Sequence, residues 1–396
     1  MAIESNPTAQ THPLQYDRVD IAPTKPKRLM SLDAFRGATI VGMILVNNPG
    51  SWSHMYPPLA HAQWHGCTPT DWIFPFFLFI VGVAVPFSQA HRRNGGSLVT
   101  GVLRRSAILF GLGLFLGAIP YSGSTGIFNL ADFRIPGVLQ RIAVCYAVVA
   151  LLSLWVGWKQ MACIGLLLLA AYFGAMRLIP APGFAAGDFS KEGNLAHFID
   201  QTILGRHGYK AYNDPEGILS TLPAIVTVIC GWLVGTWLRR ADRTAAEKVA
   251  GVFSFGVLGV MSSWVLDSAL MPINKQIWTP SYVIHTAGLA CLGLGLFYWI
   301  IDIVGYQKWA SPLIACGMNA ITIFVLAGVV GRLMLIKAVP AATGERGAIK
   351  PWLYDTLFKP LFESPYNESL AWALVFVALF IALAMAMHRA RIYIKV

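Results

Sequence analysis

Long runs of apolar residues, separated by shorter polar, charged or proline-containing stretches, are the dominant pattern in this chain of 396 residues. A helix needs about 20 mostly apolar residues to cross the hydrocarbon core of a bilayer. Runs of that length recur along the chain and predict an all-α, polytopic membrane protein with about ten transmembrane helices. The predicted helices are 30–49, 69–89, 102–120, 135–157, 160–179, 217–238, 248–266, 279–301, 310–334 and 368–388.

The composition supports the same fold class. Charged residues make up 12% of the chain and hydrophobic residues 56%, whereas charged residues account for about 25% of an ordinary soluble domain. A soluble fold of this length could not hide so much apolar surface. The composition therefore excludes a disordered chain and a nucleic-acid-binding module. The six cysteines are scattered without a CxxC pair, which disfavours a disulfide scaffold.

The charge distribution predicts the orientation of the helices. The formal net charge is +11, and Lys and Arg collect in the loops that would be cytoplasmic if the N-terminus lies inside. Both termini are therefore expected in the cytoplasm. Residues 1–28 are polar and lack an apolar core, so we expect a cytoplasmic tail rather than a signal peptide. Residues 29–396 are expected to form a single transmembrane domain.

Polar residues gather at the helix ends that this orientation places on the outer side. Amide, carboxylate, guanidinium and aromatic groups together suit a polar sugar, because aromatic rings stack on sugar rings while polar groups bind hydroxyls. The alternative is that these residues are interfacial anchors and helix caps. The candidates for binding the substrate are Trp64, Asp71, Gln140, Arg141, Asp214, Glu216, Asn274, Lys275 and Trp278.

The stretch between the first two predicted helices is rich in histidine. His61 is a candidate for proton transfer, because imidazole has an ordinary pKa close to neutrality. His61 and His65 are four residues apart, a spacing that also occurs in metal sites. No glutamate lies between them and nearby prolines disfavour a regular helix, so we expect no metal. A structural role for these histidines is the remaining alternative.

A second cluster of charge lies at the cytoplasmic ends of the helices. Arg28, Asp33 and Arg36 surround the start of the first predicted span, and Arg105 lies near the start of the third. Arginine suits the recognition of phosphate groups. These residues are therefore candidates for binding a phosphate-rich cofactor from the cytoplasm, although anchoring of the helices explains most such charges equally well.

Several motifs in this order resemble the heparan-α-glucosaminide N-acetyltransferases and their bacterial NagX-like relatives. The resemblance runs from Arg28 to near the end of the chain. The motifs are RLMSLDAFRG at 28–37, VN at 46–47, HAQWHG at 61–66, TDWIFPFF at 70–77, RIPGVLQRI at 134–142, DPEG at 214–217, NKQIWTPSY at 274–282 and GMNA at 317–320.

The resemblance implies a transmembrane acyltransferase that uses cytoplasmic acetyl-CoA. In this family the acetyl group goes to the amine of a terminal glucosamine on the far side of the membrane. The resemblance also implies that His61 is catalytic and that Asn47 belongs to the active site. His65 stands where lysosomal members have Asn. A homodimer and the inner membrane of a bacterium are further expectations from the resemblance.

The reaction and the overall activity each leave alternatives open. His61 could take a proton from the attacking amine while the Asn47 amide stabilises the oxyanion, or His61 could carry the acetyl group itself. The main alternative to an enzyme is an inner-membrane transporter of N-acetylglucosamine or a related amino sugar. A third hypothesis is acetylation of another polar acceptor, such as a glycan or an antibiotic.

Overall fold

Helices form most of the described structure. The computed structural model describes residues 29–89, 95–119, 133–208, 214–340 and 346–394. Within these ranges the strands are one antiparallel pair, β1 and β2. The expectation of an all-α polytopic fold is therefore confirmed. Arg28 and the predicted tail 1–28 lie outside the described residues.

The order of the elements follows the apolar runs of the sequence. The main elements are α1 (Met30–Asn47), α2 (Pro69–Gln89), α3 (Gly95–Ala118), α4 (Val138–Leu152), α5 (Trp158–Leu178), α6 (Leu195–Leu204), α7 (Thr221–Leu238), α8 (Ala245–Ala269), α9 (Pro280–Phe297), α10 (Ser311–Met318), α11 (Ala320–Leu333), β1 (Lys337–Pro340), β2 (Arg346–Ala348), α12 (Ile349–Leu353) and α13 (Pro365–Arg389). The shorter turns are η1 (Pro57–Leu59), η2 (Gly205–His207), η3 (Tyr298–Ile303), η4 (Lys308–Ala310), η5 (Tyr354–Phe358) and η6 (Lys359–Leu361).

The number of spans differs from the predicted ten. Seven helices of the described chain are long and apolar enough to cross a membrane, or eight if α10 and α11 count as one broken span. These two helices meet at an angle of 73°, which an apolar run does not reveal. Helix α4 has 15 residues, about 22 Å, and is shorter than a hydrocarbon core of about 30 Å. Helix α1 is not among the seven helices either, because the charged side chains of Asp33 and Arg36 lower its mean hydropathy.

Glycines let three pairs of helices approach closely. A Cβ atom on Gly37 of α1 would lie 1.8 Å from the carbonyl oxygen of Leu313 on α10. A Cβ on Gly231 of α7 would lie 2.0 Å from the carbonyl oxygen of Phe79 on α2. Gly288 of α9 packs in the same way against α8. Small residues at crossings are typical of helix packing in membranes, where backbones must come close to gain dispersion energy.

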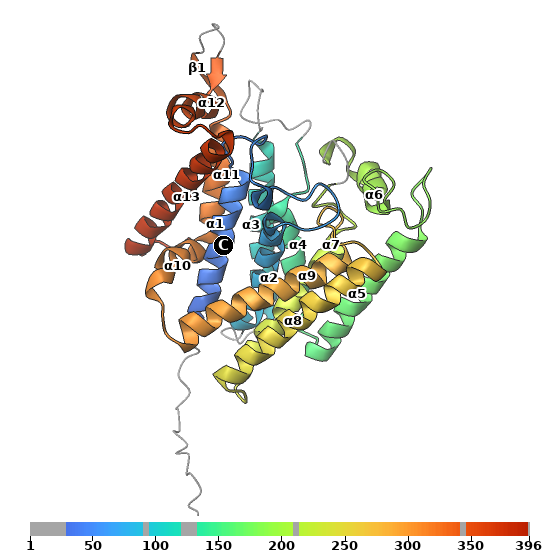
Figure 1. The fold of residues 1–396 in the computed structure, drawn as a ribbon. Helices are drawn as coiled ribbons and strands as arrows, with labels where there is room; N and C mark the ends of the chain where they lie inside the picture. Colours follow the sequence, from blue (N-terminus) through green and yellow to red (C-terminus); the bar gives the residue numbers. More distant parts are fainter. Residues whose placement is uncertain (1–28, 90–94, 120–132, 209–213, 341–345, 395–396) are drawn as a thin grey trace, which may run out of the picture.

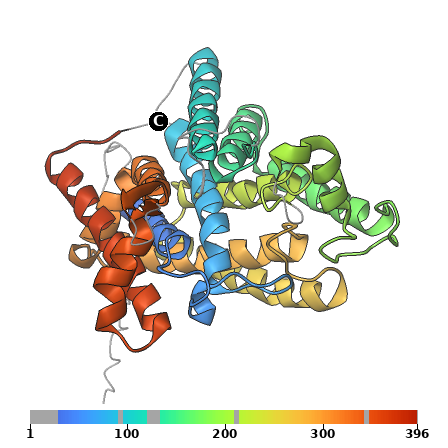
Figure 2. The ribbon, with the colours of Figure 1, turned by 90° about the horizontal axis from the view of Figure 1, so that it is seen from above.

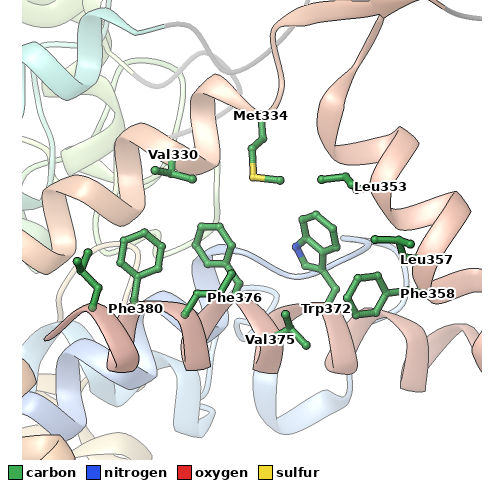
Figure 3. Close-up of a pocket in the computed structure, with 11 residues that line it drawn as sticks. Val330, Met334, Leu353, Leu357, Phe358, Trp372, Val375, Phe376 and Phe380 are labelled. Carbon is green, nitrogen blue, oxygen red and sulfur yellow. The ribbon is translucent and has the colours of Figure 1, made fainter. Parts of the chain in front are cut away.

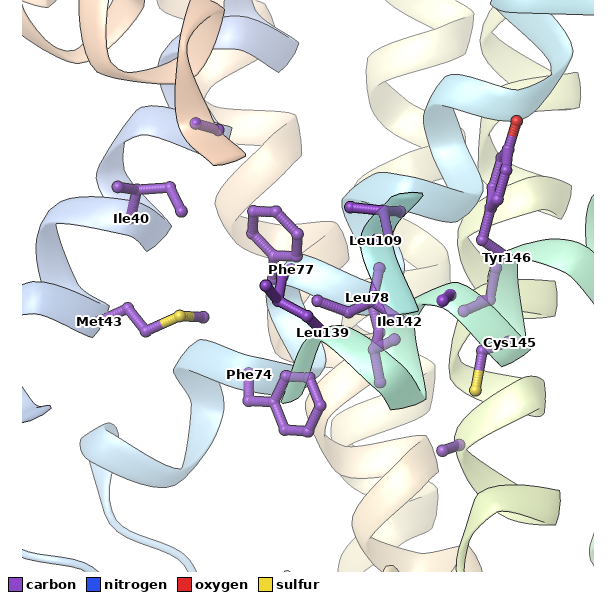
Figure 4. Close-up of a cluster of buried hydrophobic side chains, with 14 of the residues drawn as sticks. Ile40, Met43, Phe74, Phe77, Leu78, Leu109, Leu139, Ile142, Cys145 and Tyr146 are labelled. Atoms are coloured by element: carbon purple, nitrogen blue, oxygen red, sulfur yellow. The ribbon is translucent and has the colours of Figure 1, made fainter. Parts of the chain in front are cut away.

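The largest buried cluster joins the first four helices. Ile40 of α1, Phe77 of α2, Leu109 of α3 and Ile142 of α4 point into the same interior (Figure 4). Seen from above, α13 lies on one flank of the molecule and α5 with α6 on the other, with α2 and α3 between them (Figure 2). The buried cluster therefore holds together the middle of the bundle, from which the candidate site is built.

One end of the bundle carries the long connections. The loop 48–68 leaves α1 at this end, where α2, α4, α7 and α9 begin (Figure 1). We call it the site end. The segments between α5 and α7 and between α11 and α13 also lie there, and each folds into short elements of its own.

Candidate active site

The loop between α1 and α2 is fixed by contacts with the start of α13. The amide of Gly50 donates to the carbonyl oxygen of Ser369 at 3.2 Å. The hydroxyl of Tyr56 donates to Oδ1 of Asn367 at 2.6 Å. Closer to α2, the hydroxyl of Thr68 donates to the carbonyl oxygen of Ala60 at 2.7 Å. These bonds hold a segment with little regular structure in one conformation.

Asp71 in the first turn of α2 orients His61. Oδ2 of Asp71 accepts hydrogen bonds from the amides of Ala62 at 3.0 Å and Thr68 at 3.1 Å, and the Thr68 hydroxyl oxygen also lies 3.0 Å from it. Oδ1 lies 2.7 Å from Nδ1 of His61. A carboxylate surrounded by so many donors is ionised and accepts only. Nδ1 of His61 therefore carries a proton, and Nε2 is left as a base.

Lys275 completes the cluster from the loop that precedes α9. Its Nζ lies 3.2 Å from Oδ1 of Asp71 and 3.0 Å from Nδ1 of His61. The loop is positioned by the bond from the amide of Gly66 to the carbonyl oxygen of Ile273, 2.8 Å long. The Asp71 side chain is 1% exposed and the His61 side chain 41% exposed. The buried carboxylate is thus neutralised by an ammonium, while the imidazole remains accessible.

Trp278 and Tyr282 form the floor beneath this cluster. The hydroxyl of Tyr282 donates to the carbonyl oxygen of Asp71 at 2.6 Å. Trp278 is fully buried, and its indole nitrogen donates to the hydroxyl of Thr227. The Arg141 guanidinium lies 5.1 Å from the centre of the Trp278 ring. Trp278 was predicted to bind the substrate, and in this structure its ring is packed by other side chains.

A network of arginine and acidic residues lies beside the floor. Arg134 forms ion pairs with Asp214 and Glu216. Burial opposes the charge of Arg134, but these two carboxylates outweigh it and raise the pKa of the guanidinium. Arg141 donates from Nη2 to the carbonyl oxygen of Gly217 at 2.9 Å. The network therefore ties the segment before α7 to the start of α4.

Arg141 retains unused hydrogen-bonding groups. It is 2% exposed, and its Nε and Nη1 have no hydrogen-bond partner among the described residues. Gln140 donates from Nε2 to the carbonyl oxygen of Ile135 at 2.9 Å. The structure thus uses Gln140 to stabilise the turn before α4, whereas Arg141 has donors left over for a water molecule or a ligand.

The remaining candidates at the site end have different surroundings. The indole of Trp64 donates to the carbonyl oxygen of Phe189 at 2.8 Å. Asn274 is fully buried and accepts from the amide of Ile277, so it shapes the loop that carries Lys275. Asn47 is the last residue of α1 and is exposed. Across the described ranges, no hydrogen bond joins the side chains of Asn47 and His61.

The histidines of this loop turn to different partners. Nδ1 of His65 lies 3.4 Å from the amide nitrogen of Asn274, whereas Nδ1 of His61 faces Asp71. Burial lowers the pKa of His65, although the charge of Asp267 opposes this. The described part of the chain holds no group of three or more His, Cys, Asp or Glu side chains that could bind a metal ion.

The residues predicted to bind a cofactor from the cytoplasm already contact other groups of the protein. Nη1 of Arg36 donates to Oδ1 of Asp33 at 2.9 Å and to the carbonyl oxygen of Gly317 at 3.4 Å. The Arg105 guanidinium lies 4.9 Å from the centre of the Tyr146 ring. The buried Nε of Arg105 has no hydrogen-bond partner within the residues described. Arg36 thus helps to join α1 to α10, and Arg105 keeps an unused donor.

Sequence reasoning did not anticipate how the cluster is assembled. Lys275 was assigned to the substrate, yet it contacts His61 and Asp71 directly. The bond between the Thr68 amide and the Asp71 carboxylate resembles a capping box, and its T-x-x-D spacing was visible in the sequence. The contact of Lys275 had no such signal, because Lys275 lies 204 positions after Asp71 in the chain.

Comparison with known proteins decides the family. Residues 28–267 match the model of the family described as heparan-alpha-glucosaminide N-acetyltransferase, catalytic. The chain belongs to this family. It is 30% identical to the human heparan-alpha-glucosaminide N-acetyltransferase over 356 aligned residues, covering 76% of this chain and 52% of the human protein. It is 29% identical to the mouse protein of the same name over 357 residues, covering 75% and 53% respectively.

The match is to part of those relatives. The chain spans about half the length of the curated relatives that it matches. The matched region includes His61, Asp71 and the arginine network, whereas Lys275 lies just beyond the end of the family model. The resemblance first noted in the motifs is therefore confirmed, and His61 and Asp71 lie in the part of the chain that matches the family model.

Proposed function

We propose that this protein is a transmembrane N-acetyltransferase. It moves an acetyl group from cytoplasmic acetyl-CoA to the amine of a glucosamine-type sugar at the outer face of a bacterial inner membrane. The observation that carries the proposal is the contact of His61 with Asp71 and Lys275 in a chain of this family. An accessible imidazole with a fixed tautomer suits proton transfer, and a sugar carrier has no evident need for one.

The reaction requires a base and an acceptor for developing negative charge. The amine nitrogen forms a bond to the thioester carbonyl carbon, the bond between that carbon and sulfur breaks, and the thiol leaves. Nε2 of His61 takes the proton of the amine and returns it to the departing sulfur. In the alternative route Nε2 attacks the carbonyl first, the bond between carbon and sulfur breaks and the thiol leaves, and the amine then displaces the imidazole. Asn47, at the end of α1, is our candidate donor to the oxyanion.

Lys275 and Asp71 act on the charge state of His61. The Asp71 carboxylate holds the proton on Nδ1 and stabilises an imidazolium once it forms. The ammonium of Lys275 lies 3.0 Å from Nδ1 and also contacts Asp71. The two partners occupy the Nδ1 side of the ring, so Nε2 is the atom that takes a proton or attacks the carbonyl, which either route requires.

The acyl donor would enter from the opposite end of the bundle. Its phosphates carry negative charge, and the unused, buried Nε of Arg105 provides a donor for an anion. Arg36 is partly committed to Asp33, so we assign it a supporting role, and Arg28 is a further candidate. The acetyl thioester would then reach His61 through the bundle, with the N-terminus and C-terminus in the cytoplasm.

The acceptor would bind at the site end near His61. Its polar groups would contact Trp64 at the rim and the free donors of Arg141, which lie beside Trp278. The residues that support this region are Gln140, Asp214, Glu216 and Asn274. The single transmembrane domain 29–396 would carry the whole reaction, and a homodimer is the assembly that we propose.

Turnover by the purified protein tests the proposal. In detergent it should release CoA from acetyl-CoA only when an amino sugar is present, and His61→Ala should abolish the release. Acetyl-CoA binding by the variant, measured by calorimetry, should be retained. Release of no CoA by the wild type, together with unchanged sugar uptake by His61→Ala cells, would instead identify a transporter.

A further inference from the structure

An apolar groove lies between α11 and α13 and is separate from the candidate active site. It has a volume of about 410 Å³. Its walls come from α11, from α13 and from the segment α12–η5 that connects them (Figure 3). Every residue that lines it is apolar: Val330, Met334, Leu353, Leu357, Phe358, Trp372, Val375, Phe376, Leu379, Phe380 and Leu383.

The groove faces the lipid layer. Helix α13 is long and apolar enough to span a membrane, and α11 belongs to the broken span α10–α11. Leu379 is 63% exposed and Val330 37% exposed, so the groove opens sideways. Water does not fill an apolar groove that opens into hydrocarbon, and an empty one would forfeit dispersion contacts along its walls. Within the membrane, the groove is surrounded by the acyl chains of lipids.

The two ends of the groove differ in polarity. At one end Trp372 packs edge to face against Phe358, with ring centres 5.4 Å apart. Polar groups lie just beyond, where Lys350 has its Nζ 6.0 Å from the Trp372 ring centre. At the other end the lining continues to Leu383, eleven residues further along α13, a length of about 16 Å. The groove therefore matches a linear apolar chain attached to a polar head.

We propose that this groove is a binding site for one acyl chain of a phospholipid from the leaflet at the site end. The chain lies along α13 between Trp372 and Leu383. The headgroup lies beside Lys350, at the level where the hydrocarbon layer ends. The proposal does not depend on the reaction that the protein catalyses.

The bound chain supports the loop that leads to His61. A Cβ atom on Gly50 would lie 3.1 Å from Cβ of Trp372, so the loop rests directly on a wall of the groove. Nζ of Lys350 donates to the carbonyl oxygen of Pro49 at 2.7 Å. Filling the groove holds Trp372 in place and thereby holds the 49–50 segment.

Photo-crosslinking tests the proposal. The full chain is reconstituted in nanodiscs of phosphatidylglycerol that contain a trace of the same lipid with a diazirine on one acyl chain, and adducts are mapped by mass spectrometry. Adducts should concentrate on the lining residues of α13 and α11. Leu379→Trp, which fills the groove, should remove most of them. Leu374→Trp is the matched control, because Leu374 is 50% exposed on α13 and does not line the groove.

Three outcomes would overturn the proposal. Adducts spread equally over the groove and the Leu374 side would mean ordinary solvation by lipid. Unchanged groove adducts in Leu379→Trp would place the chain elsewhere. Groove residues free of adducts, together with a dimer that Leu379→Trp dissociates in size-exclusion chromatography, would make the groove a dimer interface. Val375 lines the same groove. If Leu379→Trp aggregates, the adducts of Val375→Trp are measured instead.

Discussion

The chemistry of the candidate site depends on the surroundings of one imidazole. His61 has a carboxylate and an ammonium on the same ring nitrogen, at 2.7 Å and 3.0 Å. The carboxylate favours the charged ring and the ammonium disfavours it. Asp71 and Lys275 therefore occupy the Nδ1 side of the ring and leave Nε2 as the atom that acts as a base or as a nucleophile.

Removal of the ammonium should slow the reaction. In Lys275→Met the buried Asp71 carboxylate loses the ammonium that lies 3.2 Å from its Oδ1, so it holds His61 in position less well. We expect kcat/KM, measured from CoA release, to fall about tenfold. Lys275→Arg keeps the charge and should lose much less activity. Equal losses in the two variants would contradict this role for Lys275.

A buried carboxyl outside the cluster should make the stability depend on pH. Burial raises the pKa of Asp200 to about 6, whereas an aspartate in an unfolded chain titrates near pH 3.9. The stability from the neutral form is complete below about pH 4 and is lost as the pH rises through about 6. The loss of stability over this range is on the order of 3 kcal/mol.

The variant Asp200→Asn tests this dependence. It cannot ionise, so its Tm relative to that of the wild type should rise between about pH 4 and pH 7. The bond from the Ile218 amide to Oδ1 of Asp200 can be kept by the side-chain oxygen of asparagine. Thermal unfolding in detergent, followed by tryptophan fluorescence, measures the difference. Parallel curves for the two proteins would show that Asp200 does not titrate in this range.

At the scale of elements, close helix crossings place the two clusters of candidate residues. Gly37 and Gly317 allow α1 and α10 to touch, and this contact brings Arg36 to the carbonyl oxygen of Gly317. The amide side chain of Asn319, between α10 and α11, bonds the backbone of Ile392 and Ile394 after α13. The 73° bend between α10 and α11 is therefore tied to the end of the chain.

A methyl group at the crossing of α1 and α10 should be costly. In Gly317→Ala the new Cβ would lie 1.8 Å from the carbonyl oxygen of Asp33, and backbone atoms cannot move aside as a side chain can. We expect a loss of about 1–3 kcal/mol of stability. Gly111→Ala is the control, because no atom lies within 4 Å of a Cβ there. Equal Tm values for the two variants would show that α1 and α10 pack less closely.

At the scale of the whole molecule, the placement of polar residues depends on orientation. Two loops at the site end connect α1 with α2 and α8 with α9. The first loop supplies His61 and the second supplies Lys275, and both side chains contact Asp71. Lys and Arg are concentrated in the loops of the opposite end, which the positive-inside rule assigns to the cytoplasm. The cluster is thus expected to face the outer compartment.

Reporter fusions test this orientation. Green fluorescent protein fused after Val396 should fluoresce, because it folds in the cytoplasm. Alkaline phosphatase inserted after Ser190, in the loop before α6, should be active, because it needs the oxidising periplasm. The reverse pattern would place His61 on the cytoplasmic side and remove the need for transfer across the membrane.

The amino-acid pattern established the fold class and the family. Apolar runs and low charge demand a helical membrane protein, because only internally bonded backbones are tolerated in lipid. The motifs around His61 and Asp71 are local in the chain, so they indicated the family without knowledge of the fold. The predicted number, about ten spans, exceeds the seven or eight helices of the described chain that are long and apolar enough to cross a membrane, because composition does not reveal that α4 ends at Leu152 or that the chain bends at Asn319.

Only the tertiary structure decided how the candidate residues are used. Trp278 and Lys275 are three residues apart in the sequence, yet one is buried under Arg141 and the other reaches His61. Periodicity specifies the face of a helix, but both residues lie in an irregular loop whose course depends on partners such as Gly66 and Ile273. Contacts between segments distant in sequence arise when the helices pack, and no local pattern encodes them.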